Sequence, residues 1–256
     1  MSLIERIEGD DRGVYAGVPT QEEDVNPVKG KRHQADESER REVELIDLPN
    51  DAYTFIFLAE TWSQGFWFGI LVFVMKIGIF SVLFLDAYET LDGTLHADTS
   101  RLVRATQAVI LPVAVAMQED LRSTYTILSN AKYSHVVMRF HPDATKGKYY
   151  LSNFLRGADG LYSLCINFSV LLLSETVRDL FLNFAALEFL QTIDNIAFEL
   201  AKEGFLTPSL ESWACKVEGI RMPKRESSNI LTAMDSVLFV ATVENFFVVW
   251  AMFKFY

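Results

Sequence analysis

The pattern of hydrophobic and polar positions changes abruptly near residue 50. Residues 1–50 carry thirteen acidic and seven basic side chains, with scattered Gly and Pro and almost no aromatic residues. Such a segment cannot bury enough apolar surface to offset the entropy of ordering, so we expect a disordered acidic tail. Residues 51–256 contain long apolar runs between charged connections, which is typical of an all-α bundle of transmembrane helices.

The clearest membrane helix is residues 66–85, FWFGILVFVMKIGIFSVLFL. A helix of about twenty residues is about 30 Å long, which matches the hydrocarbon thickness of a bilayer. A helix buried in a soluble bundle would need a polar face, and this run has none. Its one charged residue is Lys76. We therefore predict that this segment spans a membrane.

Four further segments are weaker candidates for spans, at about residues 102–121, 158–176, 177–200 and 233–253. The first contains Pro112, which a membrane helix tolerates when neighbouring helices satisfy the freed carbonyl. The segment 177–200 is apolar in its first half and polar in its second half, so it either crosses the membrane or lies flat in the interface. The sequence thus predicts five spans, or four spans and one interfacial amphipathic helix.

A short aromatic stretch, residues 53–62, precedes the first span. Aromatic side chains concentrate at the lipid–water boundary of membrane proteins, so we expect this stretch to lie there. Asn50 or Asp51 is in position to cap the first helical turn, because both residue types accept hydrogen bonds from free backbone amides.

The charges of the connecting segments predict the orientation of the spans. Residues 122–157 hold six basic side chains and one acidic one, and residues 86–101 hold one basic and four acidic side chains. Positively charged loops face the cytoplasm, so these two connections are expected on opposite sides. Residues 202–231 again contain a basic cluster. This cluster lies on the cytoplasmic side only if the segment 177–200 crosses the membrane. This favours five spans with the C-terminus outside.

The segment 177–200 also shows the most regular helical periodicity in the chain. Apolar residues recur at alternating steps of four and three positions, which places them along one line of a helix. These residues are Leu182, Ala186, Phe189, Ile193, Ile196 and Leu200. We interpret them as a helix-packing seam. Such a seam indicates assembly with other membrane helices, as a homo- or hetero-oligomer.

Composition excludes several function classes. The chain has 23 basic and 34 acidic residues and a net charge of −11, which argues against nucleic acid as a partner. Its two cysteines and four histidines are not arranged in metal-ligand spacings, and the sequence contains no phosphate-binding glycine loop or hydrolase motif. We therefore expect no catalytic residues, no metal and no cofactor, in a protein that is not an enzyme.

Three ionisable residues lie deep within the predicted spans, namely Lys76, Glu188 and Glu244. A charge at the bilayer centre costs at least about 2.5–3.5 kcal/mol unless it is paired or hydrated, so each is a candidate functional residue. One interpretation is a structural salt bridge between Lys76 and either glutamate, in a helix-packing subunit or scaffold of a membrane assembly. The alternative is an ion channel or transporter module that uses these charges. The sequence indicates no substrate.

Two segments resemble a large group of uncharacterised multi-pass membrane proteins from diatoms, dinoflagellates and related protists. The first is VRATQAVILPVAVAMQEDL, and the second is SETVRDLFLNFAALEFLQTIDNIAFELAKEGF. Together they cover about a fifth of the chain. The residues of the second segment that match the group's pattern include Asp179, Asn183, Glu188 and Asp194. The resemblance implies an integral membrane protein packed from helices, and it implies no activity.

Overall fold

The computed structural model describes residues 45–89, 100–131, 133, 141–218, 220–224 and 229–255. They belong to one unit of the chain, residues 43–256, and are helical apart from one short pair of strands. In chain order the elements are β1 (Leu45–Asp47), α1 (Ala52–Leu58), α2 (Gln64–Glu89), α3 (Arg101–Met117), α4 (Glu119–Asn130), α6 (Lys146–Leu173), α7 (Val177–Gln191), α8 (Ile193–Lys202), α9 (Pro208–Glu218), β2 (Arg221–Pro223) and α10 (Asn229–Phe255).

The short helix α1 is held by a cap and by burial. Asp51 lies just before α1 and has an extended backbone conformation. The Asp51 carboxylate accepts a hydrogen bond from Thr54 N at 2.9 Å. Asp51 is therefore the cap, as expected. All of α1 is buried, and Tyr53 and Phe55 pack edge-to-face against aromatic rings of α2. Residues 52–58 thus lie inside the bundle, whereas the sequence placed them at a lipid–water boundary.

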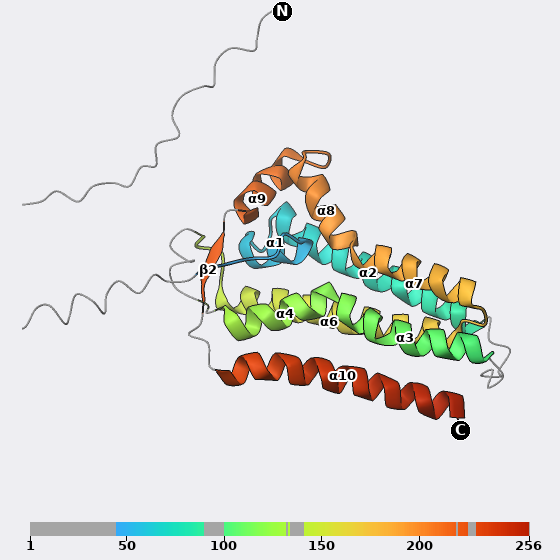
Figure 1. The fold of residues 1–256 in the computed structure, drawn as a ribbon. Coiled ribbons are helices and arrows are strands. Elements are labelled where there is room, and N and C mark those ends of the chain that lie inside the picture. Colours follow the sequence, from blue (N-terminus) through green and yellow to red (C-terminus); the bar gives the residue numbers. More distant parts are fainter. Residues whose placement is uncertain are drawn as a thin grey trace, which may run out of the picture. The chain divides into compact units, whose positions relative to one another are not determined.

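The long helices α2, with 26 residues, and α6, with 28 residues, form the middle of the arrangement. Helix α6 contacts α1, α2, α3, α4 and α7, while α10 lies along α3 and α4 (Figure 1). Phe80 of α2, Ile166 and Val170 of α6 and Leu187 of α7 form one of the apolar contacts between them. The described fold is therefore an all-α bundle, as the sequence predicts, with α6 as its central helix.

Two pairs of consecutive helices, α3 with α4 and α7 with α8, are each separated by a single non-helical residue. Helices α3 and α4 meet at Gln118, whose backbone is not helical (φ −66°, ψ 87°). Helices α7 and α8 meet at Thr192 (φ −86°, ψ 2°). Helix α3 continues through Pro112, as a membrane helix can. An interruption leaves backbone carbonyls before it and amides after it without partners inside the helix, so both breaks offer groups for other contacts.

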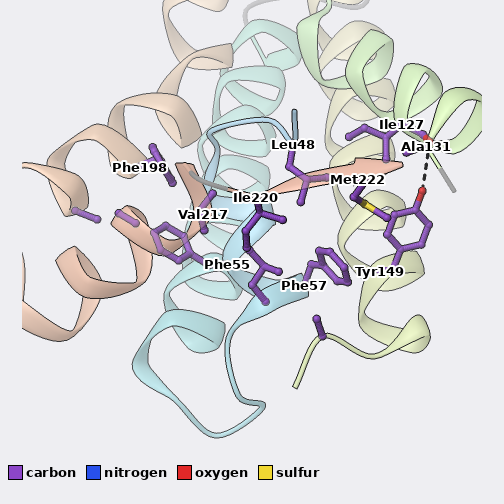
Figure 2. Close-up of a cluster of buried hydrophobic side chains, with 14 of the residues drawn as sticks. Leu48, Phe55, Phe57, Ile127, Ala131, Tyr149, Phe198, Val217, Ile220 and Met222 are labelled. Carbon is purple, nitrogen blue, oxygen red and sulfur yellow. Dashed lines mark hydrogen bonds between the residues drawn. The ribbon is translucent and has the colours of Figure 1, made fainter. Parts of the chain in front are cut away.

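A hydrophobic core fills one end of the bundle (Figure 2). Its members come from the segment after β1 and from α1, α4, α6, α8, α9 and β2. Strand β1 pairs antiparallel with β2, with Ile46 opposite the buried Met222. Because Leu48 is also buried in this core, residues 45–50 are part of the fold and not of a disordered tail. Residues 1–44 of the predicted tail lie outside the described residues.

Large apolar side chains also cover the outside of the long helices. Those more than half exposed include Leu71, Val74, Val82, Leu85, Leu102, Val109, Phe154, Leu161, Phe181, Leu182, Phe189, Val237, Val240, Val248 and Met252. Soluble monomers rarely expose apolar surface of this extent, and such surface typically marks contact with a membrane or with another protein.

In the described part of the chain, one helix is long and apolar enough to cross a membrane, α2 over Gln64–Asp86. A core helix or a signal sequence can have the same length and composition. A shorter apolar stretch, Val240–Met252, lies in α10. Helix α6 is less apolar because it buries a polar face, formed by Ser152, Asn153, Arg156, Asp159, Ser163 and Asn167. Helix composition by itself therefore supports one span, not the five that we expected.

Candidate functional site

The centre of the bundle contains charged side chains, which proteins rarely bury completely. Six of them, none more than 8% exposed, form what we call the charge cluster: Asp51, Lys76, Asp120, Arg156, Asp159 and Asp194. Asp51 caps α1, and the other five residues come from α2, α4, α6 and α8. The cluster therefore joins segments that are far apart in the sequence.

Lys76 lies at the middle of this cluster. Its Nζ is 2.6 Å from Asp159 Oδ2, 2.7 Å from Asp194 Oδ1 and 3.0 Å from Asp120 Oδ2. It also donates to the backbone carbonyl of Gln191 at 3.0 Å. That carbonyl is available because α7 ends at Gln191. An ammonium group has three hydrogens, so four oxygens compete for them.

Tyr53 extends the cluster from α1. Its hydroxyl donates to Asp159 Oδ2 at 2.7 Å, the same oxygen that pairs with Lys76. Burial and the neighbouring Asp159 carboxylate raise the pKa of Tyr53 far above its usual range, so the phenol keeps its proton and acts as a donor. Lys76 Nζ lies 5.8 Å and Arg156 Cζ 5.7 Å from the centre of its ring. Tyr53 thus lies close to both cations of the cluster.

Arg156 and Asp51 form the second ion pair. Arg156 Nε lies 2.7 Å from Asp51 Oδ2, and Nη2 lies 2.9 Å from Asp51 Oδ1, which is the two-pronged geometry that suits a carboxylate. The guanidinium also donates to Asn153 Oδ1 at 3.0 Å and to Thr54 Oγ1 at 3.2 Å. This pair attaches the start of α1 to the middle of α6.

Three of the four aspartates lie where helices begin. Asp51 caps α1, while Asp120 and Asp194 lie in the first turns of α4 and α8. The start of a helix carries a partial positive charge and free amides, which favour a carboxylate. The starts of α4 and α8 exist only because the chain is interrupted at Gln118 and Thr192. The interruptions therefore help to stabilise carboxylates inside the bundle.

Among the described residues, the two cations of the cluster do not balance its four carboxylates. Four carboxylates and two cations give a formal charge of −2 when all six groups are ionised. Asp159 Oδ1 and Asp194 Oδ2 are buried without a hydrogen-bond partner among the described residues, and so are the amide nitrogens of Gln118 and Gln191. Buried polar atoms without partners are unfavourable, so the two carboxylate oxygens mark where a proton, a water or a small cation would bind, whereas the two amide nitrogens can only donate, for example to a water.

Three carboxylates of the cluster also resemble a metal-ligand set. Oxygens of Asp51, Asp120 and Asp194 lie within 4.8 Å of one another, and carboxylate oxygens are good ligands for hard cations. However, Lys76 already pairs with two of these aspartates and Arg156 pairs with the third. A resident divalent ion would compete with both cations. Because the protein's own cations already occupy these carboxylates, the geometry disfavours a permanent metal site.

Of the three charges that the sequence predicts inside membrane spans, only Lys76 belongs to the cluster. Glu188 is partly buried on α7 and lies beside Asn167 of α6. Glu244 is exposed on α10. Within the described residues, the expected bridge between Lys76 and one of these glutamates is not found, because the partners of Lys76 are three aspartates.

The predicted packing seam faces away from the bundle. Leu182, Ala186, Phe189, Ile196 and Leu200 are exposed, and Ile193 is half-buried. The inner face of the same segment consists of Leu180, Leu187, Gln191, Asp194 and Phe198. The seam therefore does not pack inside this chain, and its packing against a helix of another molecule stays a prediction.

Sequence reasoning missed most of the cluster. Asp120 falls at the end of the candidate span 102–121 and Arg156 in the basic connection 122–157, yet both are buried in the bundle. Asp159 and Asp194 were not singled out as buried charges. A signal for part of the site exists in α6, where Arg156, Asp159 and Ser163 recur at helical spacing as a polar stripe. Such a stripe indicates an inward-facing polar surface.

Comparison with known proteins identifies no relative. No family model, no curated protein and no solved structure matches the chain. The resemblance to multi-pass membrane proteins of protists therefore stays an expectation, and the function has to be argued from the geometry of the charge cluster.

Proposed function

We propose that this chain is a multi-pass membrane protein that moves protons by way of its charge cluster, as a transporter or channel module. The observation that carries the proposal is a buried cluster with excess negative charge, placed beside two interrupted helices and inside a bundle with an apolar exterior. The bilayer is its principal partner. In this proposal the protein is not an enzyme and does not bind nucleic acid.

The lengths and directions of the helices support five passes. Helix α6, with 28 residues, is about 42 Å long, which exceeds the thickness of the hydrocarbon layer. Lys148 Nζ at the start of α6 donates to Ala59 O just before α2. Thr207, after α8, donates to Gln64 Oε1 at the start of α2 at 3.2 Å. The segment 177–202 thus returns to the end where α2 and α6 begin, which supports a crossing over a flat interfacial helix.

The position of the cluster supports transport. Lys76 lies halfway along α2 and Asp159 halfway along α6, so both would be near the centre of the bilayer. Transporters commonly build their sites at this depth from interrupted helices, whose free ends face the transported ion. The interruptions at Gln118 and Thr192 lie next to Asp120 and Asp194, in agreement with that arrangement.

The membrane location is tested by labelling from the two sides. We would place single cysteines at Glu60, Glu203 or Glu175, all exposed, in a chain whose two native cysteines are replaced by serine. An impermeant thiol reagent should label positions 60 and 203 from one side and position 175 from the other. Labelling of all three from the same side contradicts the proposal.

Proton movement is tested in liposomes under a membrane potential. Wild-type protein should acidify or alkalinise the lumen, and Asp194→Asn should lower the initial rate at least about tenfold because it removes a titratable group of the cluster. Glu188→Gln is the matched control, since Glu188 is a carboxylate on the adjoining helix α7 outside the cluster. Wild-type protein without proton flux, or equal loss in both variants, contradicts the proposal.

A scaffold or assembly subunit is the second candidate function. The observation that favours it is the outward direction of the predicted seam, where Leu182 is 56% and Phe189 is 62% exposed. Apolar faces of this kind are available for other membrane helices. Two results would support this function over transport. Wild-type protein would be normally stable but show no proton flux, and Phe189→Cys would crosslink to another chain.

A further inference from the structure

We infer that the outer face of α10 is the interface through which two copies of this chain associate in the membrane. The inference rests on the membrane location proposed above and does not depend on proton movement. The outer face of α10 consists of Val237, Val240, Glu244, Val248 and Met252, all of which are exposed.

Helix α10 packs on the rest of the chain through its opposite side. Trp250 is buried against Leu111 of α3 and Phe168 of α6, and its indole nitrogen donates to Gln107 Oε1 at 3.4 Å. The helix lies along α3 and α4 (Figure 1). Within the described part of the chain, the outer face of α10 is left without a neighbouring helix.

Glu244 distinguishes this face from the other apolar surfaces of the bundle. It lies close to the middle of α10, and it has no hydrogen bond or ion pair with any other described residue. A carboxyl group that faces lipid at this depth is strongly unfavourable, and intramembrane carboxylates normally face a protein partner. We therefore expect the partner of Glu244 to come from outside the described residues.

A second copy of the chain supplies a matching partner. The neighbouring Asn245 is also exposed, and its Nδ2 uses one hydrogen on Ala241 O at 2.7 Å. The second amide hydrogen and the Oδ1 stay available. In a two-fold dimer, Asn245 of each copy can donate to the partner's Glu244, because one patch carries both the acceptor and the donor. Hydrogen bonds of this kind hold membrane helices together.

The membrane also fixes the direction of the contact. Both copies insert with the same orientation, so the two-fold axis is perpendicular to the membrane plane and the two α10 helices run parallel. Residues at the same depth then lie side by side, so each Glu244 lies next to Asn245 of the other copy. A cation from a different protein could pair with Glu244 but would leave Asn245 unmatched, which favours a second copy as the occupant.

Disulfide crosslinking in native membranes tests the interface. Single cysteines at Val240 or Val248 are introduced into a chain with Cys165→Ser and Cys215→Ser, which removes both native thiols. Oxidation should give a product of twice the 29.1 kDa chain mass. Val82→Cys on α2 is the control, because Val82 is 66% exposed, compared with 51% for Val240 and 58% for Val248.

Substitution of the polar pair tests its role. Glu244→Leu with Asn245→Leu should lower the crosslinked fraction of Val248→Cys at least about fivefold. Glu244→Gln should retain crosslinking, since an amide can still form the hydrogen bond. Thermal unfolding in detergent shows that each variant folds, so a loss of crosslinking reports on association.

The crosslinking results decide whether a second copy of the chain binds the outer face of α10. Equal crosslinking at Val82→Cys, no crosslinking at either α10 position, or a product that contains a different protein would each overturn the second-copy interface, and would leave the proposed membrane location intact. A chain that is missing from the membrane fraction would overturn the interface and the membrane location together.

Discussion

Lys76 Nζ lies 2.6 Å from Asp159 Oδ2, where α2 and α6 both reach half of their length. This contact joins α2, an apolar helix, to α6, a helix with a polar interior face. Lys76 is the one charged residue of α2 between Gln64 and Leu85. Asp159 also accepts a hydrogen bond from Tyr53. Removal of either partner therefore changes several contacts at once.

Lys76→Met should strongly destabilise the protein. The substitution leaves Asp120, Asp159 and Asp194 buried without their common cation, and removal of one member of a buried pair costs about 3–5 kcal/mol. We expect a large fall in the thermal unfolding temperature in detergent. Lys202→Met is the control, because the Lys202–Glu218 pair is open to solvent and surface pairs of this kind contribute little to stability. Similar falls in the two variants would refute a special role for Lys76.

The double variant Lys76→Met with Asp159→Asn should be more stable than Lys76→Met alone. Removal of both charges restores the formal charge of the cluster to its original value and no longer leaves Asp159 as an unpaired anion. The coupling is measured as the difference between the double variant and the two single variants in unfolding free energy. A value of zero would show that the two side chains do not stabilise one another.

Arg156→Lys should destabilise the protein even though it keeps the charge. A lysine cannot reproduce the two-pronged contact with Asp51 or the further bonds to Asn153 and Thr54, and the expected cost is about 1–3 kcal/mol. Chemical unfolding in detergent measures it. Arg221→Lys is the matched control, because Arg221 pairs with Asp47 at the exposed surface. Equal stability of both variants would show that the two-pronged contact contributes little.

Apolar run length predicted α2 well and α6 poorly. The run at 66–85 falls within α2, because almost every position there except Lys76 suits a lipid or apolar neighbour. Helix α6 begins at Lys146, well before the expected boundary near residue 158. In the first half of α6, Ser152, Asn153 and Arg156 point into the bundle. The average hydropathy over both faces of this half is therefore low, and the segment resembles a polar loop in the sequence.

The charge cluster depends on tertiary contacts that local patterns do not contain. The sequence identified Lys76 because a charge inside an apolar run is visible locally. Its partners Asp120 and Asp194 lie just after helix interruptions, where polar residues look like the end of a span. Pairing them with Lys76 requires the arrangement of α2, α4 and α8 in space, which no periodicity specifies.

Gly69→Ala should destabilise the contact between α1 and α2, whereas Gly78→Ala in the same helix should not. A Cβ at Gly69 would lie 2.6 Å from Ala52 O and 2.6 Å from Ile56 Cγ1, and a backbone oxygen cannot move aside easily. We expect a loss of about 1–3 kcal/mol. At Gly78 a Cβ meets nothing within 4 Å, so alanine should gain about 0.5–1 kcal/mol from its helix propensity. Thermal unfolding in detergent compares the two variants. Equal effects, or a more stable Gly69→Ala protein, would contradict the close approach of α1 to α2 that positions Tyr53 beside Lys76.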